Sequence, residues 1–369
     1  MNSNVDKKIC VISAYAYIVD HVNYGSILQY YALQKVLEHN GYNPFWLRFR
    51  FHKKNNLKQS VKKALKVVIR PKNTYLKNKT QKSFETFINK LLKVSDRLYY
   101  CEEELERDCP EAFAYITGSD QVWGGTLKPN YLCFVPDNKK KLSYAASFGR
   151  STIDDEQFNT VAPWIKRLDV VSVRESSGKD ICASMSIDAE LVLDPTLLIN
   201  REQYPADIAY AQRNGKYVFG YFLNLYSQNQ LPVGSIEKYC DKHDLRFIVT
   251  GGVQGAENLP AKNIGYFSPE QWLGMYSQAE VILTNTFHGT VFALIYQKPF
   301  IVFLQDGATS KQNERIYSLL KMFHLENRIY DYSNSLECQI NLQINWEQIN
   351  ECLSDKRKES ERFLLESLK

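Results

Sequence analysis

Short apolar runs alternate with segments of helical periodicity along the first half of the chain. Strands are expected at 9–15, 112–117, 141–147, 169–173 and 190–193, where apolar residues cluster between polar stretches. Helices are expected at 26–40, which Gly25 precedes and Asn40-Gly41 closes, and at 155–168. Alternation of this kind is typical of a parallel α/β sheet.

The same alternation restarts after the polar stretch 200–215. Strands are expected at 216–222, 245–250, 280–284 and 299–304, and helices at 228–242, 268–277, directly after His288, and along the charged tail 346–368. The pattern predicts an α/β protein with two doubly wound domains, residues 1–199 and 200–345. We expect the C-terminal helix, residues 346–369, to pack back on the first domain.

Composition agrees with two globular domains of ordinary size. The chain has 369 residues, of which 44% are hydrophobic and 24% charged, so disorder over most of it is excluded. The eight cysteines are scattered and form no C-x-x-C pair, which favours reduced thiols in a cytosol over a zinc site or a disulfide framework. No apolar run reaches transmembrane length, and the first apolar run is interpreted as a strand and not as a signal peptide. We expect a cytoplasmic protein.

The net charge of +5 is unevenly distributed. Residues 48–82 hold 13 of the 46 Lys and Arg residues and none of the 41 Asp and Glu residues, so the rest of the chain is acidic overall. Within this basic segment, apolar residues from Leu57 to Val68 recur at helical spacing opposite lysines. A solvated surface helix is one interpretation, and docking on an anionic membrane surface is the other. Nucleic acid is disfavoured because no aromatic residues interleave the basic ones.

Six polar motifs are placed just past the carboxyl ends of predicted strands. They are NYGS at 23–26, GSDQVW at 118–123, SFG at 147–149, RE at 174–175, DPT at 194–196 and TNTFHG at 284–289. Doubly wound sheets bind ligands at this edge because helix N-termini and turning backbone converge there. The sequence therefore predicts a ligand-binding cleft built from these motifs.

The TNTFHG motif places a histidine in the first turn of a helix. Free backbone N–H groups and the helix dipole favour an anion near His288, and Gly289 lets a ligand approach the backbone closely. Thr284, Asn285 and Thr286 add hydrogen-bonding groups beside an apolar strand, and such groups need partners. A satisfied structural histidine is the alternative, but the cluster favours a functional site.

The motifs of the first domain leave alternatives open. Arg174 and Glu175 form either a surface salt bridge or, with Arg174 facing the cleft, a fork for a carboxylate or phosphate. Ser119 or Asp120 caps the next helix, or Asp120 and Gln121 act as general base or as ligands of sugar hydroxyls.

Two further motifs give weaker signals. Asp194, before Pro195, is more typical of a turn residue than of a catalyst, and Asn23, Gly25 and Ser26 lack any complete phosphate-loop pattern. No metal-binding cluster is visible. Cationic groups, carboxylates and a histidine together indicate an α/β transferase with an anionic donor.

The motifs GSDQVW, SYAASFG, SVRE, VLDPTLLI and TNTFHGTVFALIYQKPFIVF, in this order, resemble the polysaccharide pyruvyltransferase family from about Asn23 to Phe303. The resemblance implies a GT-B-like fold in which two Rossmann-like domains face a central cleft. It also implies transfer of the enolpyruvyl group of phosphoenolpyruvate, with no further cofactor, onto a hexose such as galactose in a capsule or exopolysaccharide precursor. The product is a pyruvate ketal, commonly across O4 and O6, and phosphate is released.

The resemblance also suggests roles for the residues that match the motifs. On the donor side we expect Arg174, Thr284, Asn285, Thr286, His288, Gly289, Lys298 and Arg315. On the acceptor side we expect Asn23, Gly25, Ser26, Ser119, Asp120, Gln121 and Glu175. The hypothesis is that His288 acts as the acid or contacts the phosphate, that Arg174 holds an anionic group, and that Asp120 orients or deprotonates the acceptor.

Two positions depart from the family pattern. Relatives typically have an arginine two residues before the histidine, where this chain has Thr286. Either Arg315 or Lys298 is a candidate to supply the missing charge. Ser26 stands where many relatives have an acidic residue.

Partners and rival functions follow from the same reasoning. A polyprenyl-linked oligosaccharide at the inner face of the membrane is a natural acceptor, and the basic segment would then hold the enzyme peripherally at an anionic surface. The rival functions are a GT-B-type glycosyltransferase with a nucleotide-sugar donor and a non-catalytic polysaccharide-assembly protein.

Overall fold

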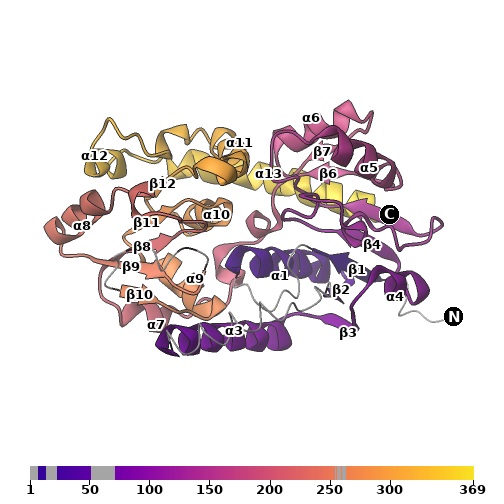
Figure 1. Ribbon diagram of the computed structural model, residues 1–369, viewed down its shortest axis with the longest axis horizontal. Helices are drawn as coiled ribbons and strands as arrows, with labels where there is room; N and C mark the ends of the chain where they lie inside the picture. Colours follow the sequence, from indigo (N-terminus) through magenta and orange to yellow (C-terminus); the bar gives the residue numbers. More distant parts are fainter. Residues whose placement is uncertain (1–6, 14–22, 51–70, 254, 256–258, 260–262) are drawn as a thin grey trace.

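The chain folds into two lobes, each built on a five-stranded parallel sheet (Figure 1). This computed structural model describes residues 7–13, 23–50, 71–253, 255, 259 and 263–369. The sheets have the orders β3-β2-β1-β4-β5 and β10-β9-β8-β11-β12, and all pairings are parallel. Each lobe thus repeats the 3-2-1-4-5 order of a Rossmann-like fold, which confirms the predicted fold class.

The first lobe contains the following elements. Its strands are β1 (Lys8–Ile12), β2 (Asn43–Phe49), β3 (Val94–Tyr99), β4 (Ala114–Thr117), β5 (Lys140–Ser143), β6 (Ser172–Val173) and β7 (Glu190–Leu191). Its helices are α1 (Tyr24–His39), α3 (Pro71–Leu91), α4 (Glu102–Arg107), α5 (Asp155–Ile165) and α6 (Ser176–Ser184). Isolated bridges, such as the one between Leu142 and Val170, attach the β6-β7 pair beside β5.

The second lobe and the tail contain the remaining elements. The strands are β8 (Tyr217–Tyr221), β9 (Arg246–Thr250), β10 (Asn263–Gly265), β11 (Val281–Thr284) and β12 (Phe300–Val302). The helices are α7 (Ile208–Gln212), α8 (Val233–Lys242), α9 (Pro269–Gln278), α10 (Phe287–Ile295), α11 (Glu314–Met322), α12 (Leu336–Ile340) and α13 (Trp346–Ser367).

The central strands β1, β4, β8 and β11 are among those that the sequence predicts, whereas β2 and β3 of the first sheet and β10 of the second were not predicted. Every residue of β4, β8 and β11 is buried, because helices cover both faces of a parallel sheet. β2 and β3 were missed because their apolar runs are interrupted: β2 contains Asn43, Pro44 and Arg48, and edge strand β3 exposes Asp96 and Arg97. An edge strand is only partly buried, so it carries little of the apolar pattern.

Helix boundaries shift where local chemistry ends a helix. The helix expected from residue 228 begins at Val233, because Pro232 occupies the N-cap position and 228–230 form a separate 3-10 turn. The helix expected to reach 168 ends at Ile165, two residues after an internal proline.

The helix α1 joins the two lobes. Its first residue, Tyr24, is fully buried, donates a hydrogen bond of 2.8 Å to the carbonyl of Phe267, and stacks on Trp272 of the second lobe at 4.8 Å. The N-terminus of α1 therefore belongs to the interface between the lobes. This contact places the start of α1 beside the carboxyl edge of the second sheet.

The C-terminal helix α13 runs from the second lobe to the first (Figure 1). Near its start, Asn350 accepts a hydrogen bond from Gln297 in the second lobe. Further along, Ser360 accepts from the backbone N–H of Leu193, and Glu361 accepts from Asn40 of the first lobe. The expected packing of this helix on the first domain is confirmed.

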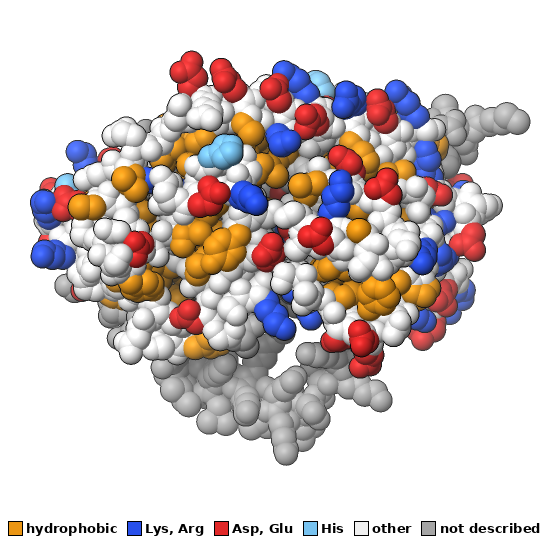
Figure 2. Space-filling model, turned by 90° about the horizontal axis from the view of Figure 1, so that it is seen from above, with side chains coloured by type: hydrophobic (Ala, Val, Ile, Leu, Met, Phe, Trp, Pro, Cys, Tyr) orange, Lys and Arg blue, Asp and Glu red, His pale blue; other side chains and the backbone are white. Residues whose placement is uncertain are grey.

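The basic segment is only partly described. Residues 51–70, which include the proposed amphipathic helix, lie outside the described residues, whereas α3 follows directly and packs the ring of Phe84 on Tyr24 at 4.9 Å. Figure 2 shows the face that carries α11, α12 and α6, where acidic and basic side chains are interspersed. Among the described helices, none is both long and apolar enough to cross a membrane.

Candidate active site

A cavity of about 260 Å³ lies where the carboxyl edges of the two sheets meet. It is lined by Asn23, Asp120, Gln121, Tyr221, Leu223, Asn224, Gly252, Val253, Thr286, Phe287, His288, Gln305, Gln312 and Arg315. The first lobe contributes one carboxylate, and the second lobe contributes a guanidinium and an imidazole. This distribution suits a small anionic ligand on the wall of the second lobe and a ligand with hydroxyl groups on the wall of the first.

The wall from the second lobe begins with the N-terminus of α10. Thr286 caps this helix by accepting a hydrogen bond of 2.9 Å from the N–H of Gly289, and Thr284 donates to the carbonyl of Tyr221 at 2.7 Å. A Cβ at Gly289 would lie 2.0 Å from Thr284 Oγ1, so only glycine fits beside the threonines. The two hydroxyls thus shape the turn, and of the two threonines Thr286 reaches the cavity.

Asn285 supports the same wall from behind. Its side chain accepts from the N–H of Leu223 and donates to the carbonyl of the same residue, at 2.8 and 2.7 Å. Gln305 donates to the carbonyl of Asn285 and accepts from Asn224. Asn285 therefore ties the segments after β8, β11 and β12 together and is absent from the cavity lining, where we expected it.

The imidazole of His288 is held between the lobes. Its Nε2 lies 3.7 Å from Asp194 Oδ2 and makes no hydrogen bond within the described part of the chain. A Cβ at Gly25 would lie 2.1 Å from His288 Nδ1, so the ring packs directly on the backbone of α1. Gly25 is thus required for close approach, and its neighbour Ser26 is buried within the capped first turn of α1.

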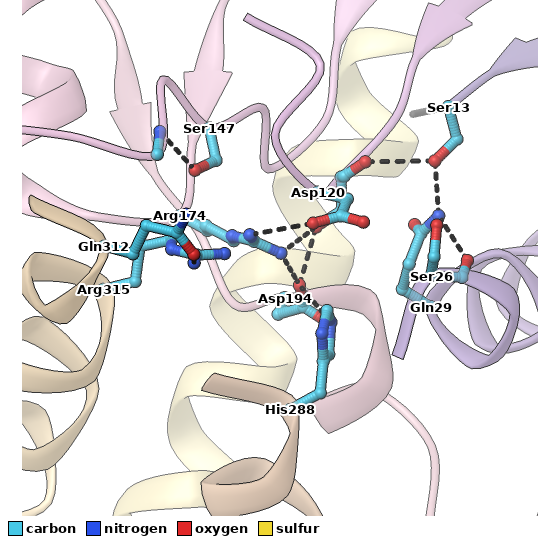
Figure 3. Close-up of polar contacts among 12 residues, drawn as sticks. Ser13, Ser26, Gln29, Asp120, Ser147, Arg174, Asp194, His288, Gln312 and Arg315 are labelled. Carbon is cyan, nitrogen blue, oxygen red and sulfur yellow. Dashed lines mark hydrogen bonds and ion pairs between the residues drawn. The ribbon is translucent and has the colours of Figure 1, made fainter. Parts of the chain in front are cut away.

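The guanidinium of Arg174 is fully buried and is absent from the cavity lining, and Figure 3 shows it between Asp120 and Asp194. It donates to Asp194 at 2.7 Å and to Asp120 at 3.4 Å, and its Nε lies 3.6 Å from Glu175. Its plane packs over the ring of Phe287 at 4.5 Å. Neither expectation for Arg174 holds: it is not part of a surface salt bridge, and it is not a fork open to the cavity, because three carboxylates already occupy it.

Burial and neighbouring charges shift the pKa values of Glu175 and Asp194 in opposite directions. Burial raises the pKa of Glu175, and Arg174 offsets only part of this effect. Burial would also raise the pKa of Asp194, but the imidazole of His288 together with Arg174 and Ser119 outweighs it and holds the pKa well below the usual range. Asp194 is therefore the firmly ionised member of the cluster. Glu175 accepts a hydrogen bond from the N–H of Phe148 and does not reach the cavity, contrary to its expected contact with the acceptor.

Asp120 is the carboxylate that faces the cavity. Its backbone has a φ of +77°, a conformation that side-chain-bearing residues rarely adopt. Behind it, the hydroxyl of Ser13 donates to the carbonyl of Ser119, and Gln29 donates to Ser13. Asp120 Oδ1 accepts from Arg174, and Oδ2 is buried without a hydrogen bond to the described residues.

The two candidates for the missing cationic charge have different positions. Arg315, in the first turn of α11, lines the cavity and donates to Gln312 at 3.2 Å. Lys298 lies between α10 and β12, at the amino end of its strand, and does not line the cavity. The geometry therefore favours Arg315.

The structure divides the residues expected from the sequence into two groups. Those that line the cavity are Asn23, Asp120, Gln121, Thr286, His288 and Arg315. Those that lie behind or outside it are Gly25, Ser26, Ser119, Arg174, Glu175, Thr284, Asn285, Gly289 and Lys298. Most residues of this second group shape the turns that follow the strands and do not face the cavity.

Several lining residues were not expected. Tyr221 ends β8, Leu223 and Asn224 follow it, Gly252 and Val253 follow β9, and Gln305 follows β12. Their position at or just after the ends of predicted strands was the signal that would have identified them. Asp194 was interpreted as a turn residue, and the position of its DPT motif at a strand end was the one signal that it belongs to the site. Within the described residues, no group of three or more His, Cys, Asp or Glu side chains is arranged to hold a metal ion.

Solved structures of low sequence identity share the fold. UDP-GlcNAc 2-epimerase from Methanocaldococcus jannaschii, in complex with UDP-GlcNAc and UDP, matches with a TM-score of 0.52 and 13% identity over 94% of this chain and 99% of that chain. The UDP-N-acetylglucosamine 2-epimerase from Rickettsia bellii matches with a TM-score of 0.52 and 11% identity, over 98% of this chain and 97% of that chain. Arabidopsis thaliana UGT89C1, complexed with UDP-L-rhamnose, matches with a TM-score of 0.52 and 10% identity, over 98% of this chain and 99% of that chain. These likenesses establish a GT-B-type fold and no more.

The sequence comparison is more specific. No curated protein matches the chain significantly. The family model for polysaccharide pyruvyl transferase, however, matches residues 23–307, a range that runs from the cap of α1 to the segment after β12 and includes every residue of the cavity lining except Gln312 and Arg315. Because this match covers most of the chain, the chain belongs to the polysaccharide pyruvyl transferase family.

Proposed function

We propose that the protein transfers the enolpyruvyl group of phosphoenolpyruvate to two hydroxyls of one hexose, with galactose as the favoured sugar, and forms a cyclic pyruvate ketal. The family supports pyruvyl transfer to a polysaccharide or its precursor. The observation that carries the proposal is one cavity with an imidazole and a guanidinium on one wall and a carboxylate on the other. A donor with two anionic groups and an acceptor that must lose protons need this combination.

The reaction balances without a further co-reactant. C3 of the donor gains a proton and becomes a methyl group, and one sugar hydroxyl adds to C2 as it loses its proton. The bond from C2 to the phosphate oxygen breaks, and the second hydroxyl closes the ketal on C2. Of the two hydroxyl protons, one matches the proton gained by C3 and the other leaves with inorganic phosphate.

The second lobe is assigned to the donor. Arg315 lines the cavity at the start of α11, and His288 lies on the first turn of α10, where the helix dipole favours an anion. In this proposal Arg315 binds the phosphate or the carboxylate of the donor in place of the family arginine that Thr286 replaces. His288 supplies the proton for C3.

The first lobe is assigned to the acceptor. Asp120 faces the cavity from a constrained backbone, and Gln121 and Asn23 line the wall beside it. Arg174 holds one carboxylate oxygen of Asp120, while the other has no hydrogen bond within the described residues. Asp120 then takes the proton of an attacking sugar hydroxyl.

Substitution of Arg315 tests the donor assignment. Arg315→Gln is expected to raise the KM for phosphoenolpyruvate by roughly 10-fold to 100-fold, the effect of losing one charge-assisted hydrogen bond. Lys298→Gln is the matched control, since Lys298 lies outside the cavity, and it should leave the KM unchanged. The reverse pattern would assign the missing charge to Lys298.

The reaction itself is tested by incubating the purified protein with phosphoenolpyruvate and a panel of galactosides. The proposal predicts phosphate release in equal amount to a product whose mass exceeds that of the acceptor by one ketal-linked pyruvate. Phosphate release without this product, or no turnover with any hexose, contradicts it.

A glycosyltransferase with a nucleotide-sugar donor is the second candidate. It is favoured by the GT-B-type fold shared with a protein solved with UDP-L-rhamnose. Equilibrium binding separates the two candidates: phosphoenolpyruvate should bind and sugar nucleotides should not displace it.

We also propose that the acceptor is a lipid-linked precursor and that the basic segment 48–82 holds the enzyme peripherally at the cytoplasmic face of the membrane. Its support is the 13 Lys and Arg residues without a single acidic one. Charge reversal of the lysines between residues 53 and 66 should release the protein from anionic vesicles and leave turnover of a soluble acceptor unchanged. If the unaltered protein does not bind such vesicles, this part of the proposal is wrong.

A further inference from the structure

Asp194 does more than a turn residue requires. It caps the 3-10 turn η2 (Pro195–Leu197), and its side chain is fully buried. Its Oδ1 accepts from the N–H and the hydroxyl of Thr196 at 3.0 and 2.5 Å, which completes the turn. Its Oδ2 accepts from Ser119 at 2.6 Å and from Arg174 at 2.7 Å. The turn uses only the first oxygen, so the second oxygen needs another explanation.

The second oxygen also meets the other lobe. His288 Nε2 lies 3.7 Å from Asp194 Oδ2, and the opposite edge of the ring packs on Gly25. The backbone of His288 belongs to α10 of the second lobe, yet both groups that hold its ring belong to the first. The orientation of the imidazole therefore depends on Asp194 being in place.

The same carboxylate is joined to the other wall of the cavity. Arg174 bonds Asp194 through Nη1 and Asp120 through Nη2, so a series of neighbouring ionisable groups runs from His288 to Asp120 (Figure 3). One guanidinium faces three carboxylates here, counting Glu175.

We propose that Asp194 is a positioning residue that acts on the reaction through His288, by fixing the imidazole at the cavity wall with a proton on Nε2. The role of His288 rests on the proposed function, whereas the contact between Asp194 and the imidazole does not. Carboxylates that orient a functional histidine set which ring nitrogen carries the proton, and their loss typically costs 10-fold to 100-fold or more in activity.

A double-mutant cycle separates this role from a purely structural one. Asp194→Asn should lower kcat by about 10-fold to 100-fold, with little change in the KM for phosphoenolpyruvate. In a His288→Gln background the same substitution should lower kcat by less than about 3-fold, because the residue through which it acts is gone. An equal loss in both backgrounds would overturn the proposal.

Two matched variants control for the hydrogen bonds of the carboxylate. Ser119→Ala removes a bond to Oδ2, and Thr196→Val removes a bond to Oδ1, and each leaves the charge in place. Each should lower kcat by the same small factor in both backgrounds. Should Asp194→Asn fail to fold, Asp194→Ser, which retains a capping oxygen for the turn, takes its place in the cycle.

A readout without substrate distinguishes failure of this proposal from failure of the proposed function. In protein labelled with ¹⁵N-histidine, the signals of His288 are those absent from His288→Gln. We expect them to change in Asp194→Asn, as the proton redistributes between the ring nitrogens, and to persist in Thr196→Val. Unchanged signals in Asp194→Asn would overturn the proposal even if the protein transfers a different group.

Discussion

The two lobes have the same strand order, yet they bring different chemistry to the cavity between them. The first lobe supplies the carboxylate of Asp120, and the guanidinium of Arg174 is buried beneath it among three carboxylates. The second lobe supplies His288 and Arg315 at the starts of two helices. The sheet topology thus fixes where the site lies, and the residues just after the strands decide which charge each wall presents.

The difference extends to how the charged groups are held. In the first lobe they bond one another beneath the cavity, so a change there should affect both stability and activity. In the second lobe the polar groups cap helices and the basic groups line the cavity, so a change there should affect activity alone. Four variants test this contrast, in order of decreasing expected effect.

The largest effect is expected from the second lobe. His288→Gln should lower kcat by about 10²-fold to 10⁴-fold, the usual range for a general acid, while the free energy of unfolding changes little. His243→Gln, at the C-cap of α8 and outside the cavity, is the control and should leave kcat unchanged. Turnover that survives His288→Gln would remove the histidine from the mechanism.

Arg174→Met tests the buried cluster of the first lobe. It leaves three carboxylates without their partner and should lower the free energy of unfolding by about 3–5 kcal/mol, as measured by chemical denaturation. Arg167→Met breaks a partly exposed pair with Asp137 and should cost at most about 1 kcal/mol. Comparable losses for the two variants would contradict the assigned burial of Arg174.

Gly25→Ala tests the contact between the lobes. The new Cβ would overlap the imidazole of His288, so the ring must move and activity should fall, with a loss of about 1–3 kcal/mol in stability. Gly234→Ala, in α8, has open space around it and should be neutral or slightly stabilising. Full activity in Gly25→Ala would show that the ring position does not matter.

The smallest effect concerns the pH dependence of stability. Burial raises the pKa of Glu175 above its unfolded value of about 4.3. The folded protein therefore binds this proton more tightly, and stability declines as the pH rises from the unfolded pKa through the folded one. Glu175→Gln lacks this decline, so its stability relative to the unaltered protein should improve as the pH rises. A difference that is constant with pH would contradict the assignment.

Much of the fold and part of the site followed from the sequence alone. Buried central strands such as β4 and β11 are continuous apolar runs, and Asp120 and His288 follow them directly, so their convergence at one edge was predictable. The interrupted strands β2 and β3 were not, because partial burial removes the pattern that marks a strand.

The rest of the site depends on contacts between distant parts of the chain. Arg174 meets Asp194 because the paired strands β6 and β7 end side by side. Gly25 receives the ring of His288 because the two lobes close on each other. No local spacing encodes whether a guanidinium faces a cavity or is occupied beneath it. The sequence therefore predicted which residues lie at or near the site more reliably than it predicted the contacts that each residue makes.

The central claim, that the two walls together deliver a proton to the donor and remove protons from the acceptor, is tested most directly by running the reaction in D₂O. The account predicts a ketal whose methyl group carries one deuterium, detected by NMR or mass spectrometry, and formation of this product should be lost in His288→Gln. A ketal without deuterium, or consumption of the donor without a ketal, would contradict it.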